Sequence, residues 1–197
     1  VASIPLSRLI SKTDGMNCLV RRLLLLLLVS VPFINSPGQI RNRLGVGNEL
    51  YLKYAGGRIR QFEESNIQLA DSIYRYGQHK SDSRIRMLAL SLELPPRFIR
   101  NDTVRVREIV AELKSMSDYN LPMREFYFLT MHDYCNMLIM SGNISDAMLE
   151  ARAMSSFAAR AGSNLGQMYS HRVIGLIQSF RSNSELAVAN FSKAAEY

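Results

Sequence analysis

Two side chains that often bind metal ions stand three positions apart in the second half of this 197-residue chain. On a helix, His132 and Cys135 would share one face and could reach the same ion, with Asp133 between them. A closed zinc site needs four ligands, however, and the other histidines, His79 and His171, are distant in sequence. The spacing therefore favours a structural Cys135 and predicts no metal site.

Other residue types used in catalysis lack the surroundings that catalysis requires. Glu63-Glu64 fits the solvated face of a helix better than a pair of acid–base groups. Gly45 and Gly47 lack the strand, turn and helix of a phosphate-binding loop, and no serine stands in a nucleophile motif. We therefore expect no catalytic residue and no cofactor, and an all-α enzyme is the least favoured alternative.

The composition is that of an ordinary globular protein, with 47% hydrophobic and 21% charged residues. The formal net charge is +7, but part of it lies before residue 39 and the remaining arginines are scattered. Nucleic-acid binding calls for a clustered basic face or a recognisable module. We therefore expect no nucleic-acid partner for this region.

The N-terminal segment has the order of a secretory signal peptide. A basic head, Met16–Arg22, precedes an apolar run, Leu23–Ile34, and the small residues Ser36 and Gly38 follow. The run is shorter than the roughly 20 residues of a membrane-spanning helix. We expect a signal peptide over 16–38, cleaved after Gly38, with 1–15 as an over-extended N-terminus; an uncleaved signal anchor is the alternative.

The rest of the chain shows helical spacing of apolar residues and no alternating strand pattern. A lead-in over 39–60 contains a weak helix that Gly56-Gly57 destabilises. A helical domain over 61–197 follows, and Pro95-Pro96 is expected to end or kink one of its helices. Helix starts are predicted at Ser65-Asn66, Ser81-Asp82, Asn101-Asp102-Thr103 and Asn120-Leu121-Pro122, with further helices near 145–160, 165–180 and 184–197. The sequence thus predicts an all-α fold.

The last third of the chain repeats itself with a shift of 40 residues. Ser141–Ala147 aligns with Arg181–Ala187, and small or apolar residues then fall at matching positions. Small side chains at these positions let two antiparallel helices approach closely, while an aromatic residue fills the space between hairpins. The predicted packing residues are Cys135, Ala147, Ala151, Gly175, Ala187, Phe191 and Ala194.

This pattern resembles the later part of the tetratricopeptide (TPR) repeat. The sequence departs from it at His171, where Trp is usual, at Gln178, where Tyr is usual, and in its period of 40 rather than about 34 residues. The alternative is a helical bundle with one Ala-rich hairpin. The resemblance implies antiparallel hairpins stacked into a short right-handed solenoid, preceded by the signal peptide.

In TPR proteins the first helix of each hairpin lines a concave groove that binds a protein or peptide. Here those helices are 123–140 and 165–180, and the resemblance implies a set of groove residues by position. The matched positions are His132 and Asn136, then Arg172 and Leu176, and Tyr169 is added as a further candidate without a matching position. The alternative is that they are ordinary surface residues.

An exported TPR-like region resembles the N-terminal periplasmic sensor region of Bacteroidetes-type TPR histidine kinases and TPR transcriptional regulators. The resemblance is carried by the signal segment, by Leu69–Arg75 and by Phe126-Tyr127-Phe128. It implies a periplasmic or membrane-anchored interaction module for two-component signal transduction. The chain would be a truncated fragment that is not itself an enzyme, with the output domain beyond Tyr197.

The same resemblance implies that membrane association comes from the signal anchor or a downstream transmembrane helix, and it allows a homodimer. A stand-alone exported TPR scaffold or assembly chaperone is the alternative function.

Overall fold

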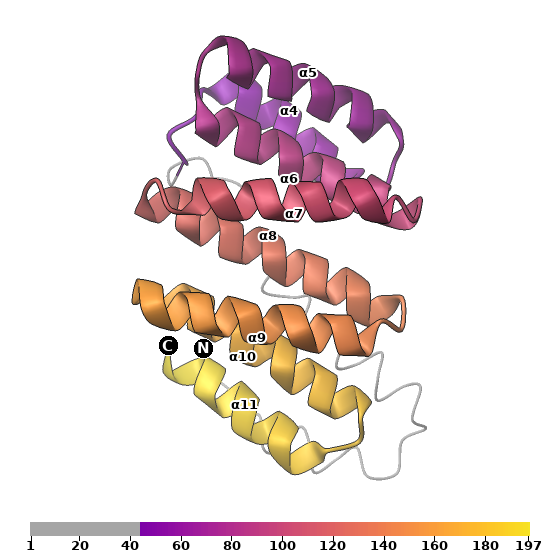
Figure 1. The fold of residues 1–197 in the computed structure, drawn as a ribbon, viewed down its shortest axis with the longest axis vertical. Helices are drawn as coiled ribbons and strands as arrows, with labels where there is room; N and C mark the ends of the chain where they lie inside the picture. The colour runs from indigo at the N-terminus through magenta and orange to yellow at the C-terminus, as the bar shows by residue number, and fades with distance from the viewer. Residues whose placement is uncertain (1–43) are drawn as a thin grey trace, which may run out of the picture. The chain divides into compact units, whose positions relative to one another are not determined.

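The computed structural model describes residues 44–197, so the predicted signal segment and the residues before it lie outside the described part. All described residues belong to one compact unit, Gly38–Tyr197. They form eight α-helices and no strand, which confirms the predicted all-α fold for this part of the chain. The helices are α4 (Asn48–Ile59), α5 (Ser65–His79), α6 (Ser83–Ile99), α7 (Thr103–Ser117), α8 (Leu121–Met140), α9 (Ile144–Ala161), α10 (Asn164–Phe180) and α11 (Ser184–Glu196) (Figure 1).

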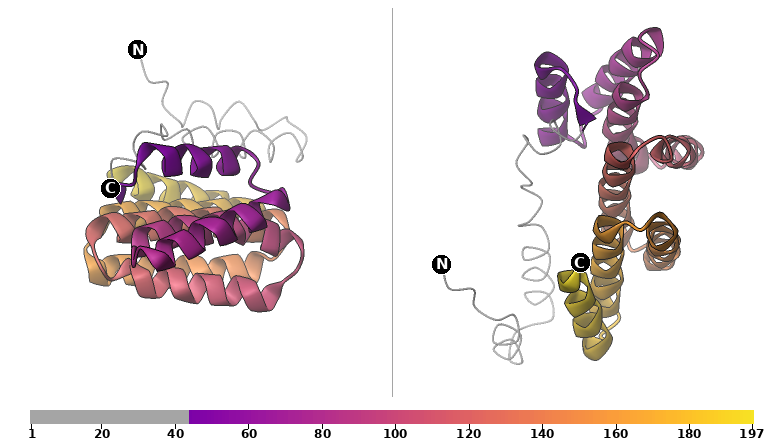
Figure 2. Two further views of the ribbon diagram at one scale, coloured as in Figure 1. Left: turned by 90° about the horizontal axis from the view of Figure 1, so that it is seen from above. Right: turned by 90° about the vertical axis from the view of Figure 1, so that its left-hand side faces the viewer.

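Each helix packs against the next one in the chain, and α8 also packs on both α6 and α10. Figure 2 shows these three helices in a row, with α7 and α9 on one side and α4 on the other. Helices that alternate in the sequence therefore share a layer. The position of α8 relative to α10 is set by their mutual packing.

Five of the turns between helices share one backbone conformation. In each, a residue with positive φ ends one helix, and the amide of the following residue donates to a carbonyl five positions back, as in the Schellman motif. The positive-φ residues are Ser81, Asn101, Gly142, Gly162 and Ser182. Because Gly142, Gly162 and Ser182 stand at intervals of 20, a hairpin spans 40 residues, which accounts for the shift seen in the sequence.

Side-chain caps begin several of the helices where the sequence predicted a start. The side chains of Asp82, Asp102 and Asn120 each accept a hydrogen bond from a backbone amide in the first turn of the helix that follows. These three starts are confirmed. The helix predicted to start at Ser65-Asn66 also begins there, at Ser65, but without the predicted side-chain cap. Asn66 Nδ2 instead donates to the carbonyls of Gly57 and Arg60, each at 2.8 Å.

The adjacent prolines of α6 do not end the helix, which continues to Ile99. Of the two expected effects of Pro95-Pro96, an end to the helix is therefore wrong, and a kink stays a prediction. Both proline rings are buried, and Glu93 accepts a hydrogen bond from Arg97 at 3.0 Å across the two prolines. Burial and this ion pair offset the two backbone hydrogen bonds that proline cannot donate.

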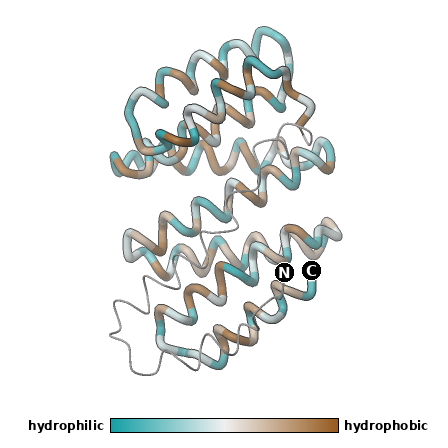
Figure 3. The backbone as a smooth tube through the Cα atoms, turned by 180° about the vertical axis from the view of Figure 1, so that it is seen from behind, coloured by the Kyte–Doolittle hydropathy of each residue, from teal (hydrophilic) through white to brown (hydrophobic). Residues whose placement is uncertain are grey.

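The predicted packing positions lie in the interior, with one exception. Cys135, Ala147, Ala151, Gly175, Ala187 and Ala194 are buried, whereas Phe191 is half-buried. A Cβ added at Gly175 would lie 2.8 Å from Phe191 Cε1, so the glycine permits the close approach of α10 and α11. Figure 3 shows hydrophobic and hydrophilic residues interspersed along the helices, as expected for helices with one buried face.

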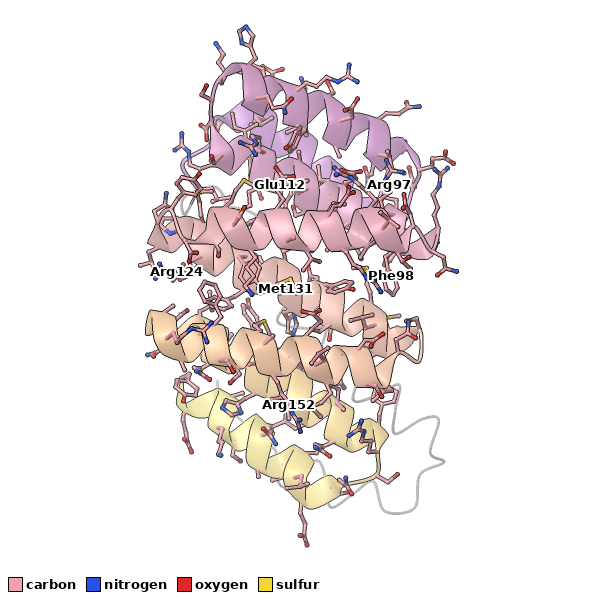
Figure 4. The ribbon with its side chains drawn as sticks, viewed as in Figure 1. Arg97, Phe98, Glu112, Arg124, Met131 and Arg152 are labelled. Carbon is pink, nitrogen blue, oxygen red and sulfur yellow. The ribbon has the colours of Figure 1, made fainter. Side chains whose placement is uncertain are left out.

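Aromatic and methionine side chains of α8 form the centre of the interior. Phe126, Phe128 and Met131 are buried, and Met131 is labelled in Figure 4. Phe98, labelled in the same figure, meets the ring of Tyr134 edge to face at a centroid distance of 6.0 Å. The Phe98–Tyr134 contact thus joins α6 to α8.

Candidate functional site

The predicted groove residues come from two helices that pack together. His132 and Asn136 stand on α8, and Tyr169, Arg172 and Leu176 stand on α10. The rings of His132 and Tyr169 lie with centroids 4.7 Å apart at an interplanar angle of 38°. The structure thus brings the two predicted sets side by side; we call these five residues the α8–α10 face.

A hydrogen-bonding group extends the α8 half of this face. Asn136 Nδ2 lies 3.4 Å from His132 Nδ1, one helical turn away. Among the described residues, Asn136 Oδ1 is buried and has no hydrogen-bond partner. This oxygen therefore keeps an unused hydrogen-bond acceptor inside the α8 half of the set.

The five residues differ in exposure. His132, Tyr169 and Leu176 are buried, with 0%, 4% and 2% of their surface exposed, whereas Asn136 and Arg172 are half-buried. Burial lowers the pKa of Arg172 and of His132, and the charge of Arg172 lowers the pKa of His132 further. Contact with a ligand therefore falls mainly to Asn136 and Arg172, and the binding role of the set stays a prediction.

Sequence reasoning missed the residues that continue this site towards α4. Arg58 Nη2 lies 2.5 Å from Asp133 Oδ2, and Asp133 Oδ1 lies 3.7 Å from His132 Nδ1. A chain of pairwise contacts therefore runs from α4 through α8 to α10: Arg58 to Asp133, Asp133 to His132, and His132 to Tyr169. The missed signal was the spacing of Tyr51, Tyr54 and Arg58, which places the three on one face of a helix.

Asp133 remains a carboxylate despite its low exposure. Burial alone would raise the pKa of Asp133, but the charges of Arg58 and His132 and their hydrogen bonds lower it below its ordinary value. Tyr54 lies beside this pair, and burial raises the pKa of its hydroxyl. Its ring packs at a centroid distance of 6.1 Å from that of Phe126. The Arg58–Asp133 pair therefore sits in an aromatic, largely dry environment.

Neither metal chemistry nor a reactive thiol stands out in the described part. Between residues 44 and 197, no three His, Cys, Asp or Glu side chains come together as a metal site. Cys135 is fully buried, and burial raises its thiol pKa well above the ordinary range. A protonated, buried thiol is inert and fits a packing role.

Two ion clusters elsewhere in the structure join neighbouring helices. Glu112 of α7, labelled in Figure 4, accepts bonds from Tyr74 at 2.5 Å and from Arg86 at 2.8 Å. Glu93 of α6 accepts bonds from Arg97 and from Arg105. Each carboxylate is satisfied by side chains of adjacent helices, so these clusters are structural.

No helix within residues 44–197 has the length and apolar character needed to cross a lipid bilayer. Comparisons with protein-family models, with curated proteins and with solved structures find no match to this chain.

Proposed function

We propose that residues 44–197 form a protein- or peptide-binding module whose ligand lies on the α8–α10 face. In this proposal the hairpins stack as in a TPR solenoid, with α6, α8 and α10 as the layer that faces the ligand. The observation that carries it is the contact between the buried rings of His132 and Tyr169, because it joins α8 to α10 of the next hairpin and brings the half-buried Asn136 and Arg172 to the same place. Asn136 and Arg172 are the half-buried members that would bind the ligand.

The chemistry of the face fits a peptide better than a small reaction substrate. Asn136 offers an amide and Arg172 offers a guanidinium group, whereas Tyr169 and Leu176 are buried and offer a ligand no surface of their own. Such a mixture recognises backbone carbonyls and side chains, and it lacks a nucleophile with an adjacent base. A binding role therefore accounts for these residues more simply than catalysis.

We further propose that the module acts outside the cytoplasm as the sensory part of a membrane signalling protein, such as a histidine kinase or a transcriptional regulator. A stand-alone exported scaffold or assembly chaperone is the second candidate. The support for export is the basic and apolar order of residues 16–38. An alkaline phosphatase fused after Tyr197 tests this, because the enzyme becomes active only when exported; an inactive fusion would count against export.

Selection of a random peptide library on the full chain tests the binding function. We expect enriched peptides that lose at least tenfold in affinity on the Asn136→Ala and Arg172→Ala variants. The Arg152→Ala variant is the matched control, since Arg152 is exposed on α9, where Figure 4 labels it. Peptides that bind all variants equally, or a library with no enriched sequence, would contradict a ligand on this face.

A further inference from the structure

The helix α4 contacts α8, which lies four helices further along the chain. It lies against α6 on the side opposite α7 (Figure 2), and it also reaches α8 through the Tyr54–Phe126 ring contact and the Arg58–Asp133 pair. Partners 75 positions apart in the chain meet at Asp133. In this arrangement α4 lies on part of the same layer that carries the proposed ligand face.

The sequence of α4 gives this helix little stability of its own. It has 12 residues, no side-chain cap at its start, and two adjacent glycines, Gly56 and Gly57, in its second half. Each glycine in a helix interior costs roughly 1 kcal/mol relative to alanine, and isolated helices of this length are marginal in water. The other contacts of α4 must therefore hold it in place.

Those contacts are concentrated on a few side chains. Tyr51, Tyr54 and Gly57 are the buried residues of α4, while Leu52 and Ile59 are 68% and 85% exposed. The charged contact to α8 is made by Arg58, which closes over a carboxylate that is 15% exposed. Loss of α4 from this place would leave the Asp133 carboxylate beside Phe126 with no counter-ion from α4.

We propose that α4 is an internal competitor, which covers an anionic docking place on α6 and α8 centred on Asp133. The partner that fits this place is a helical segment with an aromatic residue followed, four positions later, by an arginine. Tyr54 and Arg58 show that pattern in the segment that now occupies it. Charge complementarity selects the arginine, because a largely buried carboxylate requires a cation, and a guanidinium group can bind it through two hydrogen bonds.

This inference rests on the proposed binding function and extends the ligand surface from the α8–α10 face towards α6. The line Arg58–Asp133–His132–Tyr169 connects the two parts. A ligand bound along the α8–α10 face could then continue into the place vacated by α4. Displacement of α4 would thereby regulate how much of the surface a partner engages.

The test uses a fluorescent peptide with the sequence of residues 48–62 and the full chain. In the Tyr54→Ala/Arg58→Ala chain, α4 loses its two main contacts, so the docking place becomes available to the peptide in trans. We expect this chain to bind the peptide at least tenfold more tightly than the wild-type chain. Equal binding to both chains would overturn the proposal.

A matched variant isolates the carboxylate. We expect the Tyr54→Ala/Arg58→Ala/Asp133→Asn chain to lose its binding of the peptide. We also expect a peptide with Arg58→Glu to lose its binding to the Tyr54→Ala/Arg58→Ala chain. Binding that survives either change would overturn the role of Asp133. Asp133→Asn changes the side-chain volume little, so the two-residue and three-residue variants are matched in packing. Circular dichroism on each chain verifies that α5–α11 remain folded.

Hydrogen exchange on the wild-type chain gives a readout that no substitution affects. We expect the amides of α4 to exchange faster than those of α8, and exchange at the same rate would contradict an opening α4. The library selection described above reports on Asn136 and Arg172, whereas the binding of the 48–62 peptide reports on Asp133. Failure of one therefore does not imply failure of the other.

Discussion

Arg58 and Asp133 pair across helices α4 and α8, with 2.5 Å between Arg58 Nη2 and Asp133 Oδ2. Their side chains are 26% and 15% exposed, so both ions have lost much of their hydration. Removal of one partner leaves an uncompensated charge, whereas removal of both leaves none. The pair therefore matters more through the cost of breaking it than through the attraction itself.

We expect Asp133→Ala to lower the free energy of unfolding by about 3–5 kcal/mol, because Arg58 would then lie unpaired in a dry environment. Arg58→Met combined with Asp133→Leu should cost clearly less than the single change. Urea unfolding of both variants and the wild type measures the difference. A double variant as unstable as the single one would show that packing, and not charge, explains the loss.

Acidification should destabilise the fold in a window set by His132. Burial lowers the pKa of His132 below its ordinary 6.5, so in this window the unfolded chain binds a proton that the folded chain does not. Stability therefore falls as the pH drops below about 6.5, until the folded protein also takes up the proton. Urea midpoints measured from pH 7.5 to 5 should show this slope in the wild type.

The His132→Gln variant should lose most of that slope, because the titrating group is gone. His79 is exposed on α5, so His79→Gln serves as the control and should keep the slope of the wild type. Equal slopes in both variants would assign the pH dependence to other groups. Loss of the Arg58–Asp133 pair belongs to a lower range, because the pKa of Asp133 is depressed below 3.8.

Two glycines should respond to alanine in opposite directions. A Cβ at Gly166 would lie 2.6 Å from Ala158 Cβ and 2.7 Å from the Phe128 ring, so Gly166→Ala should cost about 1–3 kcal/mol. A Cβ at Gly56 meets nothing within 4 Å, so Gly56→Ala should stabilise α4 by about 0.5–1 kcal/mol. Thermal unfolding of the two variants measures both effects. A destabilised Gly56→Ala chain would contradict the helical environment of that residue.

The carboxylate that bridges the prolines of α6 should matter more than an exposed one. Glu93 pairs with Arg97 and Arg105 and is 8% exposed, so Glu93→Ala should cost about 2–4 kcal/mol. Asp71 pairs with Arg75 on the surface, and Asp71→Ala should cost about 0.5 kcal/mol or less. Chemical denaturation compares the two. Equal costs would mean that the prolines need no such support.

Local chemistry allowed much of the fold to be predicted. Asp82, Asp102 and Asn120 cap helices because a side chain needs only the next turn of backbone to do so. Long-range contacts were beyond that reasoning. Burial and Glu93 keep α6 helical through its prolines, and Asn66 bonds to α4 instead of capping α5.

The candidate site shows the same division. Sequence reasoning named both His132 and Tyr169, whose rings lie together in the structure. The burial of Leu176 depends on neighbouring helices and is invisible in the spacing. Asp133 was not predicted as a site residue because its partner, Arg58, is distant in sequence and no local pattern connects the two.

The separation of Arg58 and Asp133 also has a consequence for the order of folding events. Neighbouring helices can pair as soon as both exist, because only a short turn must close between them. The contact between α4 and α8 instead closes a loop of 75 positions. At ribosomal rates of roughly 5–20 residues per second, α4 would wait about 4–15 s for α8 to be synthesised. The first described helix to be made thus completes its contacts only after α5, α6 and α7 have been synthesised, and during that interval Arg58 has no Asp133 to pair with.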